Sequence, residues 1–142
     1  MENDYSPLEI NHLGSALAGE RNSREWLFQN DFKELAALCD VMIDKNQSAS
    51  KWLIDHEFGS LILFANALNG RPGALKLLVH KEEKVWAAVV YAFNLESNAI
   101  EWLESSGYHH YVKFADKLYV LWRKKKRMRR GYRNDPDRTD WF

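Results

Sequence analysis

The sequence is poor in the residues that build covalent or metal-bound frameworks. It holds one cysteine and three prolines among 142 residues, and a single thiol forms neither an internal disulfide nor a thiolate metal site. Its longest apolar run, Val85 to Phe93, is far shorter than the roughly 20 residues of a bilayer-spanning helix. Residues 1–4 lack the basic and apolar regions of a signal peptide. We therefore expect a cytoplasmic protein without a redox framework.

The neutral net charge conceals two oppositely charged parts. Residues 1–122 contain 11 basic and 17 acidic side chains, and residues 123–142 contain 9 basic and 3 acidic ones. The body therefore carries a net charge of −6 and the last segment one of +6. Hydrophobic residues make up 46% of the chain, which is typical of a folded domain. An acidic body favours a basic partner.

Helix signals dominate the sequence. Ser6 and Asp31 are each followed by a glutamate three residues later, a spacing that caps free backbone N–H groups at a helix start. After Asp31, apolar residues recur at three- and four-residue intervals, which predicts a helix to about Asp44. No stretch alternates with the two-residue period of a strand. We expect an all-α fold without a substantial sheet.

Sliding the chain against itself by about 25 residues brings three segments into register. The aligned columns include Ala49, Ala74 and Ala99; Trp52, Leu77 and Trp102; Leu53, Leu78 and Leu103; Leu61, Trp86 and Tyr111; Phe64, Val89 and Phe114; and Leu68, Phe93 and Leu118. A fainter earlier copy places Leu27, Phe28, Cys39 and Ile43 in these columns. We predict an N-terminal capping helix over 1–21, four helical-hairpin repeats over 22–122 stacked as a small α-solenoid, and a basic extension over 123–142.

Two of these segments resemble the paired helices of an ankyrin repeat. Leu61 to Gly70 is similar to its inner helix, which ends in an alanine-rich turn and a glycine, and Pro72 to Val79 is similar to its outer helix with a leucine pair. The period of about 25 residues is shorter than the ankyrin period of about 33, and the Thr-Pro-Leu-His start is missing. The chain thus resembles a degenerate, hairpin-poor ankyrin array, and a generic helical-hairpin solenoid is the competing fold.

Candidate chemical sites are weak. Gly14 to Gly19 has the glycine spacing of a phosphate loop, but Glu20 stands where a lysine would meet phosphate. His80 and Glu83 could supply two metal ligands and lack a third. Cys39 lies in an apolar column, which predicts a buried, inert thiol. We predict no enzyme activity, no cofactor and no metal site.

Binding to another protein is the function that we expect. The ankyrin resemblance implies recognition by a concave helical face and its turns. Trp86, Tyr91 and Tyr111 are candidate partner-binding residues, because aromatic anchors dominate interface energies. Trp52 and Trp102 are expected in the core. The two final aromatics, Trp141 and Phe142, either fold back onto the repeat surface or insert into a partner.

The basic segment after Trp122 supports an alternative. It contains Arg123, Lys124, Lys125, Lys126, Arg127, Arg129 and Arg130. These candidate polyanion-binding residues would release counterions on binding nucleic acid, with Tyr132 or Trp141 stacking on bases. Docking on an acidic protein surface and a solvated charged cap are the other interpretations of the same segment.

Overall fold

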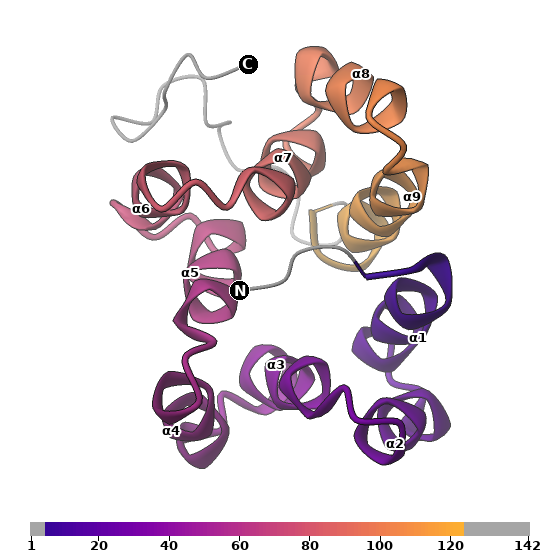
Figure 1. Ribbon diagram of the computed structural model, residues 1–142, viewed down its shortest axis with the longest axis vertical. Coiled ribbons are helices and arrows are strands. Elements are labelled where there is room, and N and C mark those ends of the chain that lie inside the picture. The colour runs from indigo at the N-terminus through magenta and orange to yellow at the C-terminus, as the bar shows by residue number, and fades with distance from the viewer. Residues whose placement is uncertain (1–4, 124–142) are drawn as a thin grey trace.

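The computed structural model describes residues 5–123, and this part of the chain is helical throughout (Figure 1). Within residues 5–123, nine α-helices and a final π-helical turn follow one another: α1 Pro7–Leu17, α2 Arg21–Gln29, α3 Lys33–Asp44, α4 Gln47–Asp55, α5 Gly59–Leu68, α6 Ala74–His80, α7 Lys84–Phe93, α8 Ser97–Ser105, α9 His109–Leu118 and η1 Tyr119–Arg123. The predicted all-α class is confirmed. Within the described residues, every helix is too short or too polar to cross a bilayer.

Five of the helices form a closed inner ring. The helices α1, α3, α5, α7 and α9 contact one another in that order, and α1 packs against α9. Each of the outer helices α2, α4, α6 and α8 packs between the two inner helices that flank it in the chain (Figure 1). The array of helical hairpins therefore closes on itself, and the inner helices face one another rather than an open concave groove.

Two sets of turns recur around this ring. Left-handed backbone conformations occur at Asp31, Glu57, Glu82 and Gly107 before the inner helices, and at Gly19, Lys45, Gly70 and Leu95 before the outer helices. Both sets are spaced by 26, 25 and 25 residues. The first interval is one residue longer than the others, so the constant offset of 25 misaligned the first copy. In the structure Leu27 corresponds to Leu53, and Leu38 rather than Cys39 corresponds to Phe64.

A fully buried leucine lies in the last turn of each outer helix. The carbonyl oxygens of Leu27, Leu53, Leu78 and Leu103 accept backbone N–H bonds from Phe32, Phe58, Glu83 and Tyr108 at 2.8, 2.7, 3.0 and 2.8 Å. Such six-to-one bonds close the C-terminal turn of a helix and pair its free carbonyl groups. The repeated leucine thus anchors each hairpin in the core and supplies a hydrogen bond that orients the next inner helix.

Capping at the two expected helix starts differs. At α1 the Ser6 backbone N–H donates to Glu9 at 2.8 Å, so the predicted start is confirmed. At α3 the prediction is wrong, because Asp31 lies in the left-handed turn and Phe32 precedes the helix. The side chain of Glu34 instead accepts a 2.7 Å hydrogen bond from the Tyr5 hydroxyl. The predicted end of this helix near Asp44 is confirmed.

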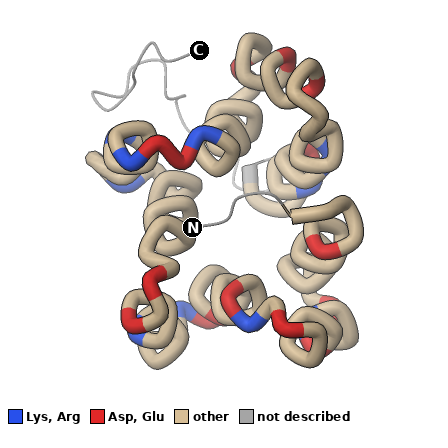
Figure 2. The backbone as a smooth tube through the Cα atoms, in the orientation of Figure 1, with Lys and Arg blue, Asp and Glu red and all other residues tan. Residues whose placement is uncertain are grey.

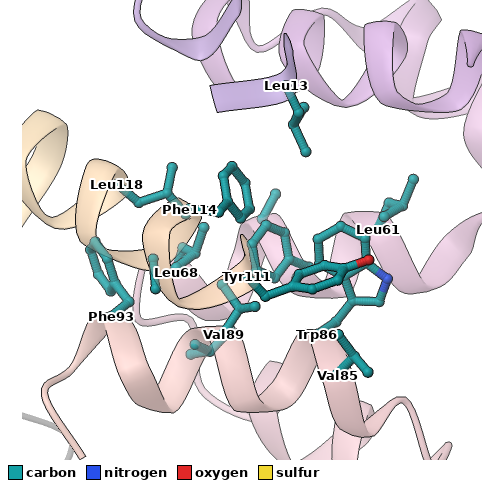
Figure 3. Packing of buried hydrophobic residues seen from close by; sticks show 14 of the residues in the cluster. Leu13, Leu61, Leu68, Val85, Trp86, Val89, Phe93, Tyr111, Phe114 and Leu118 are labelled. Atoms are coloured by element: carbon teal, nitrogen blue, oxygen red, sulfur yellow. The ribbon is translucent and has the colours of Figure 1, made fainter. Parts of the chain in front are cut away.

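Aromatic side chains fill the centre of the ring. The Trp86 ring lies 4.8 Å from the Phe64 ring and 5.8 Å from the Tyr111 ring, with the latter pair perpendicular. Figure 3 shows Trp86 and Tyr111 converging with Leu13 and Phe114 from different helices. Edge-to-face packing of this kind adds to the free energy gained by burying the rings. The centre of the ring is therefore a packed core.

The helices α1 and α9 approach each other closely at a glycine. A Cβ atom on Gly14 would lie 3.2 Å from Cδ of Lys117 and 3.6 Å from the Phe114 ring. This buried glycine lets the backbone of α1 approach α9 closely. The segment considered as a phosphate loop is thus the second half of an inner helix and its C-terminal turn.

Candidate partner-binding groove

Three of the predicted partner-binding aromatics lie in the core. Trp86 and Tyr111 are 0% exposed and Tyr91 is 1% exposed. Trp86 and Tyr111 point into the ring centre, and Tyr91 lies on α7, which packs against α5, α6, α8 and α9. Their assignment to an exposed binding surface is therefore wrong. When the repeats are aligned, Trp86 and Tyr111 share a column with Leu61, which is fully buried. This shared column indicates an interior position.

The remaining predicted site residues lie near or beyond the end of the described chain. Arg123 is the last residue of η1. Trp141 and Phe142 lie outside the described residues, as do Lys124, Lys125, Lys126, Arg127, Arg129 and Arg130. Their roles in partner or polyanion binding stay predictions.

Three other tryptophans sit on the outer helices at equivalent positions. The rings of Trp26 and Phe32 are 6.0 Å apart, those of Trp52 and Phe58 are 6.1 Å apart, and those of Trp102 and Tyr108 are 5.8 Å apart. Each of these tryptophans is half-buried and packs against the core from outside. In the hairpin that contains α6, Leu77 stands at the position of the tryptophan and Glu83 at the position of the second aromatic ring. Glu83 is buried and accepts a 2.8 Å hydrogen bond from the Ser60 hydroxyl.

A groove follows α3 beside α2; α4 borders one part of it and the end of α1 borders the other. One part of it encloses about 330 Å³ and is lined by Phe28, Lys33, Ala36, Ala37, Asn46, Ser48, Ala49 and Trp52. A second part of about 700 Å³ is lined by Ala16, Gly19, Glu20, Arg21, Asn22, Glu25, Cys39, Ile43 and Asp44. Arg24 and Asp40 line both parts. Together the two parts are named the α3 groove.

An ion pair crosses the middle of the α3 groove. Arg24 donates to both carboxylate oxygens of Asp40, at 2.9 Å from Nε and 2.7 Å from Nη2. Two parallel bonds of this kind fix the planar guanidinium in one orientation. The hydrogen bond with Asp40 raises the pKa of Arg24 above its usual value, against the opposing effect of burial. This pair links α2 to α3 and holds the centre of the groove rigid.

Apolar side chains stand exposed on both sides of this ion pair. Phe28 is 46% exposed and Ile43 is 48% exposed. The Phe28 ring lies 5.5 Å from the Lys33 ammonium and 5.9 Å from the Arg24 guanidinium. The negative potential of an aromatic face attracts nearby cations. The small residues Ala36 and Ala37 line the part that contains Phe28, so a partner backbone can come close to α3 there.

The two parts of the groove differ in charge. The part that contains Phe28 is lined by the cations Arg24 and Lys33 and the carboxylate of Asp40. The part that contains Ile43 is lined by the carboxylates of Glu20, Glu25, Asp40 and Asp44 and by the cations Arg21 and Arg24. Figure 2 shows acidic and basic residues together along α2 and α3. The groove is thus positive toward the start of α3 and negative toward its end.

Groups suited to chemistry do not gather in this groove. Cys39 is 1% exposed, and burial raises the pKa of its thiol to about 12. The predicted buried thiol is confirmed. Among residues 5–123, no three histidine, cysteine or acidic side chains are placed to hold a metal ion. The arrangement offers a rigid surface with apolar and charged contacts.

Comparison of the chain with known protein families, curated proteins and solved structures finds no match.

Proposed function

We propose that the protein is a non-catalytic scaffold that binds another protein through the α3 groove. The observation that carries this proposal is the exposure of Phe28 and Ile43 on either side of the fixed Arg24–Asp40 pair. Apolar anchors surrounded by polar side chains are typical of the centres of protein interfaces. Because the ring interior is packed, recognition falls to the outer helices and the turns.

Rigidity supports this role. The groove lies on α2, α3, α4 and the end of α1, which pack in sequence, and α3 also contacts α1 and α5 of the inner ring. A surface already held in its binding conformation loses little conformational entropy when a partner docks. The mechanism is display of fixed side chains, in agreement with the scaffold function that the ankyrin resemblance implies, but on the outer face rather than a concave one.

An affinity capture with matched variants tests the proposal. The groove variant combines Phe28→Ala and Ile43→Ala, and the control combines Ile54→Ala and Leu77→Ala, which are 61% and 49% exposed on α4 and α6. We expect the groove variant to lose a protein partner that the intact chain and the control both retain. Equal retention by both variants would overturn the groove as the binding site.

Binding of nucleic acid or another polyanion through residues 123–130 is the second candidate. The observation that favours it is the +6 charge of residues 123–142 beside a body of −6. In the same capture, a chain ending at Trp122 would lose nucleic acid, and washing at high salt would remove it from the intact chain. Nucleic acid retained by the truncated chain would contradict this assignment.

A further inference from the structure

We infer that the α3 groove takes an amphipathic helix that runs parallel to α3, with acidic side chains in its first turn and basic side chains in its last. This inference rests on the proposed function and specifies the partner's chemistry. It follows from the shape of the groove, the direction of its walls and the distribution of its charges.

The floor of the groove is a stripe along one face of α3. Lys33, Ala37, Asp40 and Asp44 follow one another at three- and four-residue steps, so they lie along one side of the helix. At 1.5 Å per residue the stripe is about 16 Å long, which corresponds to three helical turns. Ala37 leaves space for a second helix to approach.

The walls favour a helix over an extended peptide. Extended peptides that bind by strand addition need a sheet edge, and the described residues contain no strand. The helices α2 and α4 stand on either side of α3 and run antiparallel to it, because short turns join them (Figure 1). A partner helix parallel to α3 would be antiparallel to both walls, as are neighbouring helices within each hairpin.

The charges set the direction of the partner helix. Lys33 has no carboxylate partner within residues 5–123, and its ammonium lies at the start of α3. Glu20 and Asp44, at the other end of the groove, are exposed and form no salt bridge there. Helices carry acidic side chains most favourably in their first turn and basic ones in their last turn. Such a helix matches both ends of the groove only when it lies parallel to α3.

Apolar side chains supply the contacts between the charged ends. Phe28 and Trp52 line the groove near Lys33, and Ile43 lines it near Asp44. A partner helix with apolar residues at positions i, i+3 or i+4, and i+7 would place them on these three side chains. The partner is thus a three-turn amphipathic segment with one apolar stripe and charges of opposite sign at its two ends.

Two fluorescently labelled 14-residue peptides test this inference. Both have blocked ends, the same composition and the same leucine stripe; one has glutamates first and lysines last, and the other has the reverse order. We expect the glutamate-first peptide to bind the full chain about fivefold to tenfold more tightly by fluorescence anisotropy. A scrambled peptide without the leucine stripe should bind the full chain more weakly than either of them.

A charge exchange in the protein supplies the control. The double variant Lys33→Glu with Asp44→Lys should reverse the preference between the two peptides. The double variant Lys76→Glu with Glu101→Lys makes the same exchange at exposed positions of α6 and α8 and should leave the preference unchanged. Circular dichroism checks that both variants remain helical.

The outcomes separate this inference from the proposed function. Equal binding of the two peptides, an unchanged preference after the charge exchange, or binding no tighter than the scrambled peptide would each overturn the helix and its direction. If one of these peptide results is found and the Phe28→Ala and Ile43→Ala variant nevertheless loses a protein partner in the affinity capture, the proposed function stands while the helix inference falls. If that variant loses nothing, the proposed function itself fails.

Discussion

The backbone N–H of Tyr5 donates a hydrogen bond to the hydroxyl of Tyr111 at 3.1 Å, across 106 residues of sequence. The Tyr5 carbonyl lies 2.8 Å from Nε2 of His110. The Tyr5 side chain reaches Glu34 on α3. Tyr5, a single residue that precedes the first helix, thus forms hydrogen bonds to α3 and α9, the two neighbours of α1 in the ring. These bonds close the ring.

Removing the Tyr111 hydroxyl should weaken this closure. In the variant Tyr111→Phe the buried N–H of Tyr5 loses an acceptor, and an unsatisfied buried donor costs about 1–3 kcal/mol. We expect the free energy of unfolding in urea to fall by that amount. The variant Tyr119→Phe, on the half-exposed π-helical turn, should change it by less than about 0.5 kcal/mol. Equal effects of the two variants would contradict the role of Tyr111 in closure.

This closure marks the limit of what the sequence could predict. The helices, the spacing of about 25 residues and the buried Cys39 follow from local periodicity, because each depends on residues within one hairpin. Contact between α1 and α9 depends on small rotations accumulated over all the hairpins, which no single hairpin specifies. An open stack and a closed ring therefore share the same pattern, and the buried position of Trp86 was mistaken for an exposed one.

The groove was missed for a related physical reason. It is formed by α2, α3, α4 and the end of α1, and its cation–aromatic and ion-pair contacts join different helices. Arg24 and Asp40 are 16 residues apart, outside the three- and four-residue spacings of a helix face. The exposed Phe28 gave no signal of this surface, because the constant offset of 25 residues places it in a column with Leu53, Leu78 and Leu103, which are fully buried.

Substitutions at Gly14 should depend on side-chain size. In Gly14→Ala the new Cβ meets only the flexible, exposed Lys117 side chain at close range, and alanine favours the helix by about 1 kcal/mol. We expect the melting temperature to rise. In Gly14→Leu the larger side chain should separate α1 from α9 and cost about 1–3 kcal/mol. A stabilising Gly14→Leu would show that the two helices are not closely packed.

Trp86 should contribute to stability rather than to binding. Truncation of a fully buried tryptophan costs about 3–5 kcal/mol, so Trp86→Ala should unfold at much lower urea concentration. Trp86→Phe should cost less, because it keeps an aromatic ring and removes an indole N–H that has no hydrogen-bond partner within the described residues. Truncation of the half-buried Trp102 to alanine should also cost less. A neutral Trp86→Ala would place this side chain outside the core.

Cys39 should make stability depend on alkaline pH. Its thiol pKa is raised from 9.0 to about 12 by burial, so the folded state holds the proton more tightly than the unfolded state. The free energy of unfolding should therefore be unaffected by this group below pH 9 and should fall as pH rises from 9 toward 12. The variant Cys39→Ala, compared with the intact chain over this range, isolates the effect.

The thiol should also be unreactive in the folded protein. At pH 8 a thiol-specific reagent should modify Cys39 only after denaturant is added, because the folded chain supplies almost no thiolate. Rapid modification of the folded protein would contradict the burial of this residue.

The most direct test of the α3 groove as a protein-binding site is photo-cross-linking from within it. A benzophenone side chain replaces Ser48, which is exposed and lines the groove, or Lys76, which is exposed on α6. We predict that the Ser48 position cross-links one protein partner, that Phe28→Ala with Ile43→Ala abolishes this product, and that the Lys76 position does not yield it. The same products from both positions, or a product that survives the groove substitutions, would contradict the account.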